Sequence, residues 1–179
     1  MSASRLNRSP RASRAAALAG ALALGALLAC AHAPGARAGG APLCRTSGLV
    51  AWLDDEPGGG TAGSIYYKLE LTNLSGHACT LRGYPGVSAV DLRGRELAGG
   101  AAHETLHAPR LVTLSQGQSA GAVLRILDAG AISGCRPQTA AGLRVYPPGQ
   151  SAAKVVPFPF EACSRAGQSN LAVGAVTGP

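Results

Sequence analysis

The feature that most constrains the fold is a series of short apolar segments separated by glycines and prolines. In the clearest segment, over residues 65–72, four side chains are expected on the dry face of a strand: Ile65, Tyr67, Leu69 and Leu71. The alternate side chains are expected on its wet face: Tyr66, Lys68, Glu70 and Thr72. A period of two is typical of a half-buried strand, whereas an amphipathic helix needs a period near 3.6.

Similar segments follow along the chain at a spacing of roughly 8–12 residues, which is typical of sandwiches. We expect further strands at 49–53, 79–83, 87–92, 111–114, 120–127, 143–146, 154–156 and 171–173. Residues 96–110 are expected to form an irregular connection. Charged residues make up only 14% of the chain, too few for the wet faces of a helical bundle. The sequence therefore predicts an antiparallel β-sandwich of about eight or nine short strands.

The N-terminal residues have the composition of an export signal. A basic region contains Arg5, Arg8, Arg11 and Arg14, and residues 15–29 are an uncharged run. A bilayer span needs roughly 20 apolar residues, so this run is too short for one and has the length of a signal-peptide core. We predict a signal peptide over 1–38, a short linker to residue 43 and a domain over 44–179.

Two cleavage sites compete in this leader. Residues 27–30 (LLAC) resemble a lipobox, in which cleavage after residue 29 leaves a lipidated Cys30. Residues 36–38 form an A-x-A site for ordinary signal peptidase. Both alternatives remain open. The domain is expected outside the cytoplasm in either case, secreted or lipid-anchored at the cell surface, with a membrane as partner only through the lipid.

After either cleavage, four cysteines remain in the domain: Cys44, Cys79, Cys135 and Cys163. An even number of cysteines in an exported domain indicates disulfides. Three pairings are possible, and we favour the one that joins sequence neighbours, since each bridge then closes a loop of about 30 residues. The cysteines show no C-x-x-C spacing, which argues against a zinc site built from them.

The net charge of +7 does not indicate a nucleic-acid partner. Five arginines precede residue 39, and without them 11 Lys and Arg face 9 Asp and Glu, a net charge of +2. A nearly neutral domain lacks the basic surface that binds nucleic acid, so we expect no such partner. We also expect no cofactor.

Residues 103–107 (HETLH) match the H-E-x-x-H pattern of zinc hydrolases. That chemistry needs His103 and His107 one turn apart on a helix, with Glu104 polarising a zinc-bound water. A pair of glycines before the motif and Pro109 after it leave room for two helical turns at most. A recognisable third ligand is also missing, so the zinc hydrolase is kept only as an alternative.

Several segments occur in the order found in a known family: residues 67–73 (YKLELTN), 79–87 (CTLRGYPGV), 112–114 (VTL) with Gly117 and Ala120, 143–149 (LRVYPPG) and Cys163. Together they resemble the bacterial extracytoplasmic domain catalogued as domain of unknown function 4232, from about Cys44 to Val176. The segment 79–87 is its most specific part. The resemblance implies an immunoglobulin-like sandwich in secreted proteins and lipoproteins. It implies no activity, and therefore no functional residues to carry over.

The leading functional hypothesis is a non-enzymatic envelope module that binds a protein or glycan through loops or a sheet face. Its candidate contact residues are the aromatic side chains of Trp52, Tyr66 and Tyr84. Tyr84 also has a structural interpretation, with a buried ring and its hydroxyl bonded to a loop carbonyl. A purely structural role in the envelope remains a third hypothesis.

Overall fold

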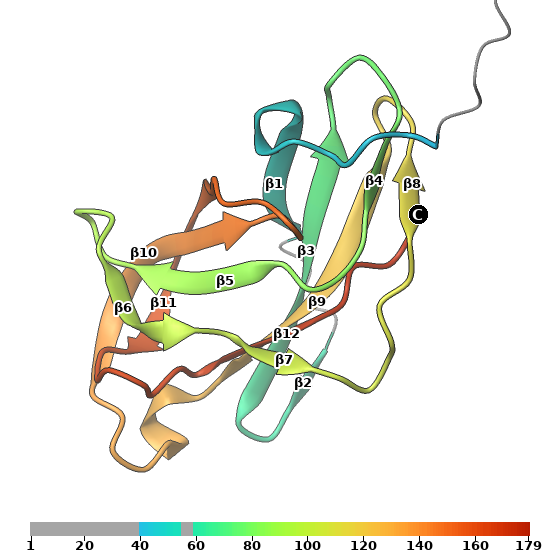
Figure 1. Ribbon diagram of the computed structural model, residues 1–179. Coiled ribbons are helices and arrows are strands. Elements are labelled where there is room, and N and C mark those ends of the chain that lie inside the picture. The colour runs from blue at the N-terminus through green and yellow to red at the C-terminus, as the bar shows by residue number, and fades with distance from the viewer. Residues whose placement is uncertain (1–39, 55–58) are drawn as a thin grey trace, which may run out of the picture. The chain divides into compact units, whose positions relative to one another are not determined.

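The computed structural model describes residues 40–54 and 59–179 (Figure 1). This part of the chain is all-β, as predicted, and its only helical elements are two 3₁₀ turns, η1 (Thr46–Gly48) and η2 (Ala129–Ala131). Its strands are β1 (Leu49–Asp54), β2 (Gly60–Thr61), β3 (Ser64–Asn73), β4 (Cys79–Leu81), β5 (Gly86–Val90), β6 (Glu96–Gly100), β7 (Ala102–Glu104), β8 (Val112–Leu114), β9 (Ser119–Leu127), β10 (Pro137–Tyr146), β11 (Lys154–Cys163) and β12 (Leu171–Gly174).

The strands form two main sheets. The larger sheet has the order β1-β3-β9-β12-β7, with β2 beside β3, and the smaller sheet has the order β11-β10-β5-β6. A separate pair joins β4 to β8. Neighbouring strands are antiparallel, apart from the parallel pair of β12 and β7. The antiparallel sandwich is thus confirmed, with one parallel pair at an edge of the larger sheet.

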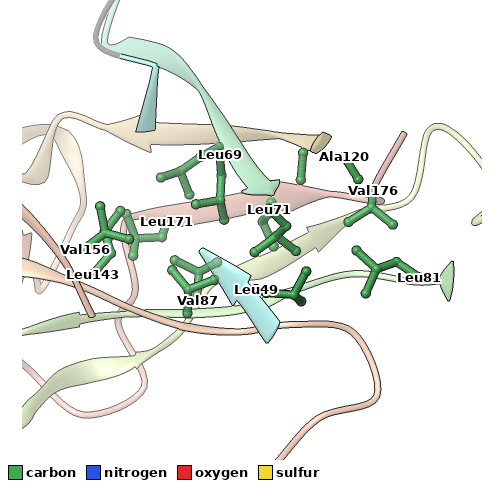
Figure 2. Packing of buried hydrophobic residues seen from close by; sticks show 14 of the residues in the cluster. Leu49, Leu69, Leu71, Leu81, Val87, Ala120, Leu143, Val156, Leu171 and Val176 are labelled. Atoms are coloured by element: carbon green, nitrogen blue, oxygen red, sulfur yellow. The ribbon is translucent and has the colours of Figure 1, made fainter. Parts of the chain in front are cut away.

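One hydrophobic core lies between the two sheets. Figure 2 shows Leu69 and Leu71 of the larger sheet facing Val87 and Leu143 of the smaller one. These four side chains are at most 2% exposed. Four alternate residues of β9 are also buried, as the pattern of 120–127 predicted: Ala120, Ala122, Leu124 and Ile126. The period-two pattern therefore identified both long strands of the larger sheet and most of their inward faces. Ile65, expected on the dry face, is instead 46% exposed.

The prediction of an irregular connection over 96–110 was wrong in part, because β6 and β7 lie within it. β6 pairs with β5 in the smaller sheet, and β7 pairs with β12 in the larger one. Between them, the Ala101 N–H donates to the Val87 carbonyl at 2.7 Å. A nearly continuous stretch thus crosses from one sheet to the other. Backbone pairing alone defines these strands, so the side-chain pattern gave no signal.

Two disulfides join the favoured pairs of cysteines. Cys44 and Cys79 have Cα atoms 4.8 Å apart, and those of Cys135 and Cys163 are 5.1 Å apart. The first bridge fastens the start of the domain to β4, where the Cys44 N–H also donates to the Thr80 carbonyl at 2.9 Å. The second joins the segment after η2 to the end of β11. Both bridges therefore fix connections between elements rather than strands within one sheet.

Two buried asparagines hold the ends of strands together. Asn170, 1% exposed, donates through Nδ2 to the carbonyls of Leu127 and Glu161 at 2.9 and 3.0 Å, and its Oδ1 accepts from the Cys163 N–H at 3.0 Å. Since Leu127 ends β9 and the other two belong to β11, this amide joins the two sheets. Asn73, 0% exposed, similarly donates to the carbonyls of His77 and Leu114.

The turn between β5 and β6 is fixed by Asp91. Its Oδ1 accepts the backbone N–H groups of Arg93 and Arg95 at 2.8 Å, and its Oδ2 accepts Nε of Arg95 at 2.8 Å. These bonds, the Arg95 backbone N–H first, lower the pKa of Asp91. A carboxylate with a lowered pKa supports folding above its ordinary titration range and loses this effect only as the pH falls through the lowered pKa. The support that Asp91 gives to this turn is therefore present at neutral pH.

The predicted signal peptide, both cleavage sites and Cys30 lie outside the described residues. Within residues 40–54 and 59–179, no helix has the length and hydropathy needed to cross a bilayer. The choice between secretion and lipid anchoring therefore stays a prediction.

Candidate functional site

The candidate site is the outer face of the larger sheet, defined here as the side chains of β1, β3 and β9 that point away from the core. The strand register places Trp52 beside Glu70, and Glu70 beside Gly121. The next row along the sheet contains Asp54, Lys68 and Val123. Tyr66 and Arg125 form the row after that. Two of the three predicted aromatic contacts, Trp52 and Tyr66, therefore share one face.

Trp52 is the most exposed aromatic side chain of this face, at 42%. Its indole Nε1 donates to Oγ1 of Thr72 at 2.9 Å, and that hydroxyl is 2.8 Å from Oγ of Ser119. The hydrogen bond uses the polar edge of the ring and fixes its orientation, while much of the indole surface remains in water. Such an ordered, exposed ring offers contact area at a low entropic cost of binding.

Glu70 departs from the sequence prediction. It was expected on a wet face, and it does lie on the outer face, but it is only 5% exposed. Lys68 accounts for this, because its ammonium pairs with Oε1 of Glu70. The Lys68 side chain lies across Gly121: a Cβ at Gly121 would be 2.4 Å from Cε of Lys68. Oε2 of Glu70 is buried, and no group among the described residues forms a hydrogen bond with it.

We expect Gly121→Ala to reduce the free energy of unfolding by about 1 kcal/mol, because the new methyl group pushes the end of the Lys68 side chain off Gly121 and weakens its pairing with the buried carboxylate of Glu70. Urea unfolding measures this effect. In a Glu70→Gln background, where the displaced ammonium no longer leaves a charge behind, the same substitution should cost much less. An equal cost in both backgrounds would show that the Lys68–Glu70 pair is not the cause.

A hollow of about 400 Å³ lies on the outer face, with Tyr66, Lys68, Val123 and Thr177 in its lining. A larger hollow of about 650 Å³ lies between residues 106–113 and the C-terminal residues. A third, of about 470 Å³, contains the aromatic rings of Tyr67, Phe158 and Phe160. We place the site at the smallest of these three, because it lies on the outer face, where Tyr66 and Lys68 line it in the rows that follow Trp52 along the sheet.

The family model described as Domain of unknown function (DUF4232) matches residues 44–177. The chain belongs to the DUF4232 family. No curated protein and no solved structure matches the chain. Because the family description carries no activity, the function of this DUF4232 domain has to be argued from its own geometry.

The structure does not bring Tyr84 of the DUF4232 domain to the outer face. Tyr84 lies between β4 and β5, and its ring stacks on His103 with centroids 4.4 Å apart and planes 9° from parallel. Its hydroxyl donates to the His107 carbonyl at 3.4 Å. The hydrogen bond to a loop carbonyl agrees with the structural interpretation of this residue, although the ring is only half-buried.

The H-E-x-x-H segment of the DUF4232 domain does not form the helix that zinc hydrolysis needs. His103 and Glu104 belong to β7, and His107 follows in a turn. Glu104 pairs with Nε of Arg125 at 2.7 Å, and His103 stacks on Tyr84. Among the described residues, no three His, Cys, Asp or Glu side chains are placed to hold a metal. The geometry does not favour the zinc alternative.

Sequence reasoning missed the roles of Glu70, Lys68 and Gly121. The two charged residues occupied ordinary wet positions of an alternating strand, and Gly121 interrupted no apolar pattern. A glycine in the middle of a long strand is a weak signal of close approach by another group, and it was the only signal available.

Proposed function

We propose that this DUF4232 domain is an exported, non-enzymatic recognition module of the cell envelope, and that its outer face binds a glycan. The observation that carries the proposal is the exposed indole of Trp52, oriented by Thr72 beside further hydroxyl and charged groups. The C–H face of a sugar ring stacks on such an indole, and the sugar hydroxyls bond to neighbouring polar groups.

The charges of the outer face favour an uncharged glycan. Lys68 pairs with Glu70, and Arg125 of β9 pairs with Glu104 of β7, on the far side of β12. Each pair neutralises itself, so the face presents no strong field of one sign that would attract a polyanion. This supports a neutral polysaccharide rather than an acidic wall polymer.

Export is supported by the disulfides together with the predicted leader. Both bridges connect cysteines of the domain itself, and such bridges persist in oxidising compartments. An envelope glycan is a ligand that an exported domain would meet there.

We expect Trp52→Ala to weaken binding of neutral envelope polysaccharide by about tenfold or more, as is usual for an aromatic residue that dominates a contact. The measurement is calorimetric titration of the purified domain with soluble polysaccharide fractions. Val155→Ala is the matched control, because Val155 is 61% exposed on β11 of the other sheet. Unchanged affinity of the Trp52 variant, or no binding by the wild type, would contradict the proposal.

A further inference from the structure

The two sheets each have a free edge on one side of the sandwich, and the two edges differ in kind. β11 ends the smaller sheet and β1 ends the larger one. β11 carries the exposed Pro157 and Pro159, which have no N–H to donate, and its register with β10 is irregular opposite them. Prolines and irregular register are the usual protection of an edge strand against pairing with another chain. β1 has neither.

β1 is a regular, apolar edge. All six of its residues pair with β3 without a break, and its only charged residue, Asp54, is at its end. Val50 and Trp52 are 43% and 42% exposed on its outer side. Within the described residues, β1 has no neighbouring strand other than β3.

The backbone groups that β1 presents to its free side can be identified. The Leu74 N–H donates to the Gly48 carbonyl at 2.8 Å, so the backbone N–H and carbonyl groups of the even positions of β1 point toward β3. The backbone groups of the odd positions, Leu49, Ala51 and Leu53, then point away from β3. The Leu49 N–H is used by the Thr46 carbonyl of η1. Within residues 40–54 and 59–179, no backbone hydrogen bond joins Ala51 or Leu53 to another segment on this side.

We propose that β1 pairs antiparallel with β1 of a second copy of this chain, about a two-fold axis at Ala51. This register places each Ala51 opposite its counterpart. The outward N–H of each Ala51 then donates to the outward carbonyl of the other, so that two hydrogen bonds form. It also places Leu49 opposite Leu53 of the second copy, on the inner side. On the outer side, each exposed Val50 meets Trp52 of the other copy, an aromatic and β-branched pair that stabilises antiparallel strands.

The second copy is favoured as the occupant because β1 is complementary to itself in this register. Every opposed pair from 49 to 53 is apolar, and Asp54 lies opposite Gly48 rather than a second charge. A shift by two residues in one direction would place Asp54 against Val50. An isologous contact of this kind closes as a dimer and does not continue into a fibre.

The dimer is expected to be weak and reversible. An edge of six residues covers much less than the roughly 1,600 Å² of a standard stable interface. Sedimentation equilibrium should therefore show the wild-type mass rising from monomer toward dimer between about 10 μM and about 1 mM.

The deciding variant is Ala51→Pro, which removes the outward N–H at the centre of β1 and leaves the hydrogen bonds to β3 in place. Because the two-fold axis doubles the loss, association should weaken by about tenfold or more. Ala51→Ser is the matched control, since it keeps the N–H. Circular dichroism tests whether the proline variant is folded. If the proline variant does not fold, Val50→Lys, at an exposed position, replaces it and should also weaken association.

A wild-type chain that stays monomeric over the whole concentration range would overturn the proposal, as would a folded proline variant that dimerises like the wild type. The outcome is separable from that of the glycan proposal, because Ala51→Pro retains Trp52. If Ala51→Pro loses the dimer but still binds the glycan, both proposals are supported. If the wild type binds the glycan but never dimerises, only the dimer proposal is contradicted.

Discussion

Replacing Cys44 and Cys79 together by alanine is expected to lower the free energy of unfolding by about 4 kcal/mol. The bridge spans 35 residues of sequence, and its removal frees that loop in the unfolded chain. Both cysteines are 1% exposed within the main core, so the smaller alanines also leave unfilled space there. The melting temperature should fall by roughly 10 °C in a domain of this size.

The Cys135–Cys163 pair provides the comparison. It spans 28 residues, so the loop term is nearly the same, but Cys135 is only half-buried. Removing it should therefore cost slightly less than removing the first bridge. Thermal and urea unfolding of the two double variants, each with the other disulfide intact, tests the order. A larger loss from the second pair would show that the position of Cys44 and Cys79 in the core does not matter.

The second large effect is expected from Asn170→Ala, at about 3 kcal/mol. The substitution removes three hydrogen bonds: the buried one from the Cys163 N–H and the partly buried ones to the carbonyls of Leu127 and Glu161. Each such group costs about 1–3 kcal/mol when water does not reach it. Because these groups belong to both sheets, amide exchange should also accelerate at the ends of β9 and β11.

Equilibrium urea unfolding with hydrogen exchange measures this effect, and Gln168→Ala is the control from the same connection into β12. The control should change stability by less than about 0.5 kcal/mol, as is usual away from buried networks. If Asn170→Ala lowered the free energy of unfolding no more than the control does, the Asn170 amide would not stabilise the contact between the two sheets.

The fold class could be predicted because strands with one buried face repeat side chains at a period of two. Leu69, Leu71 and the four inward residues of β9 follow that rule, and the core between the sheets consists largely of such positions. The pairing of the cysteines was also predictable, since it needed only sequence proximity and the expectation of an oxidising compartment. The order of the strands within each sheet was not, because no local pattern encodes which edges meet.

The candidate site was predictable only in part. Trp52 and Tyr66 could be chosen as aromatic residues of two strands, but their common face depends on the register of β1 with β3. Tyr84 has the same chemistry, yet it lies beside β7, at the opposite edge of the larger sheet. The burial of Glu70 depends on a lysine two residues away and on a glycine of another strand, a contact that exists only after the sheet has formed.

The position of the first disulfide has a mechanical consequence. Residues 45–78, which include η1, β1, β2 and β3, lie inside the loop that the Cys44–Cys79 bridge closes. A pulling force applied through the residues before Cys44 would pass across the sulfur–sulfur bond directly into β4. The enclosed strands would carry none of that tension along their chain, so a domain held by its N-terminal end could be stretched without β1 or β3 being peeled from the larger sheet.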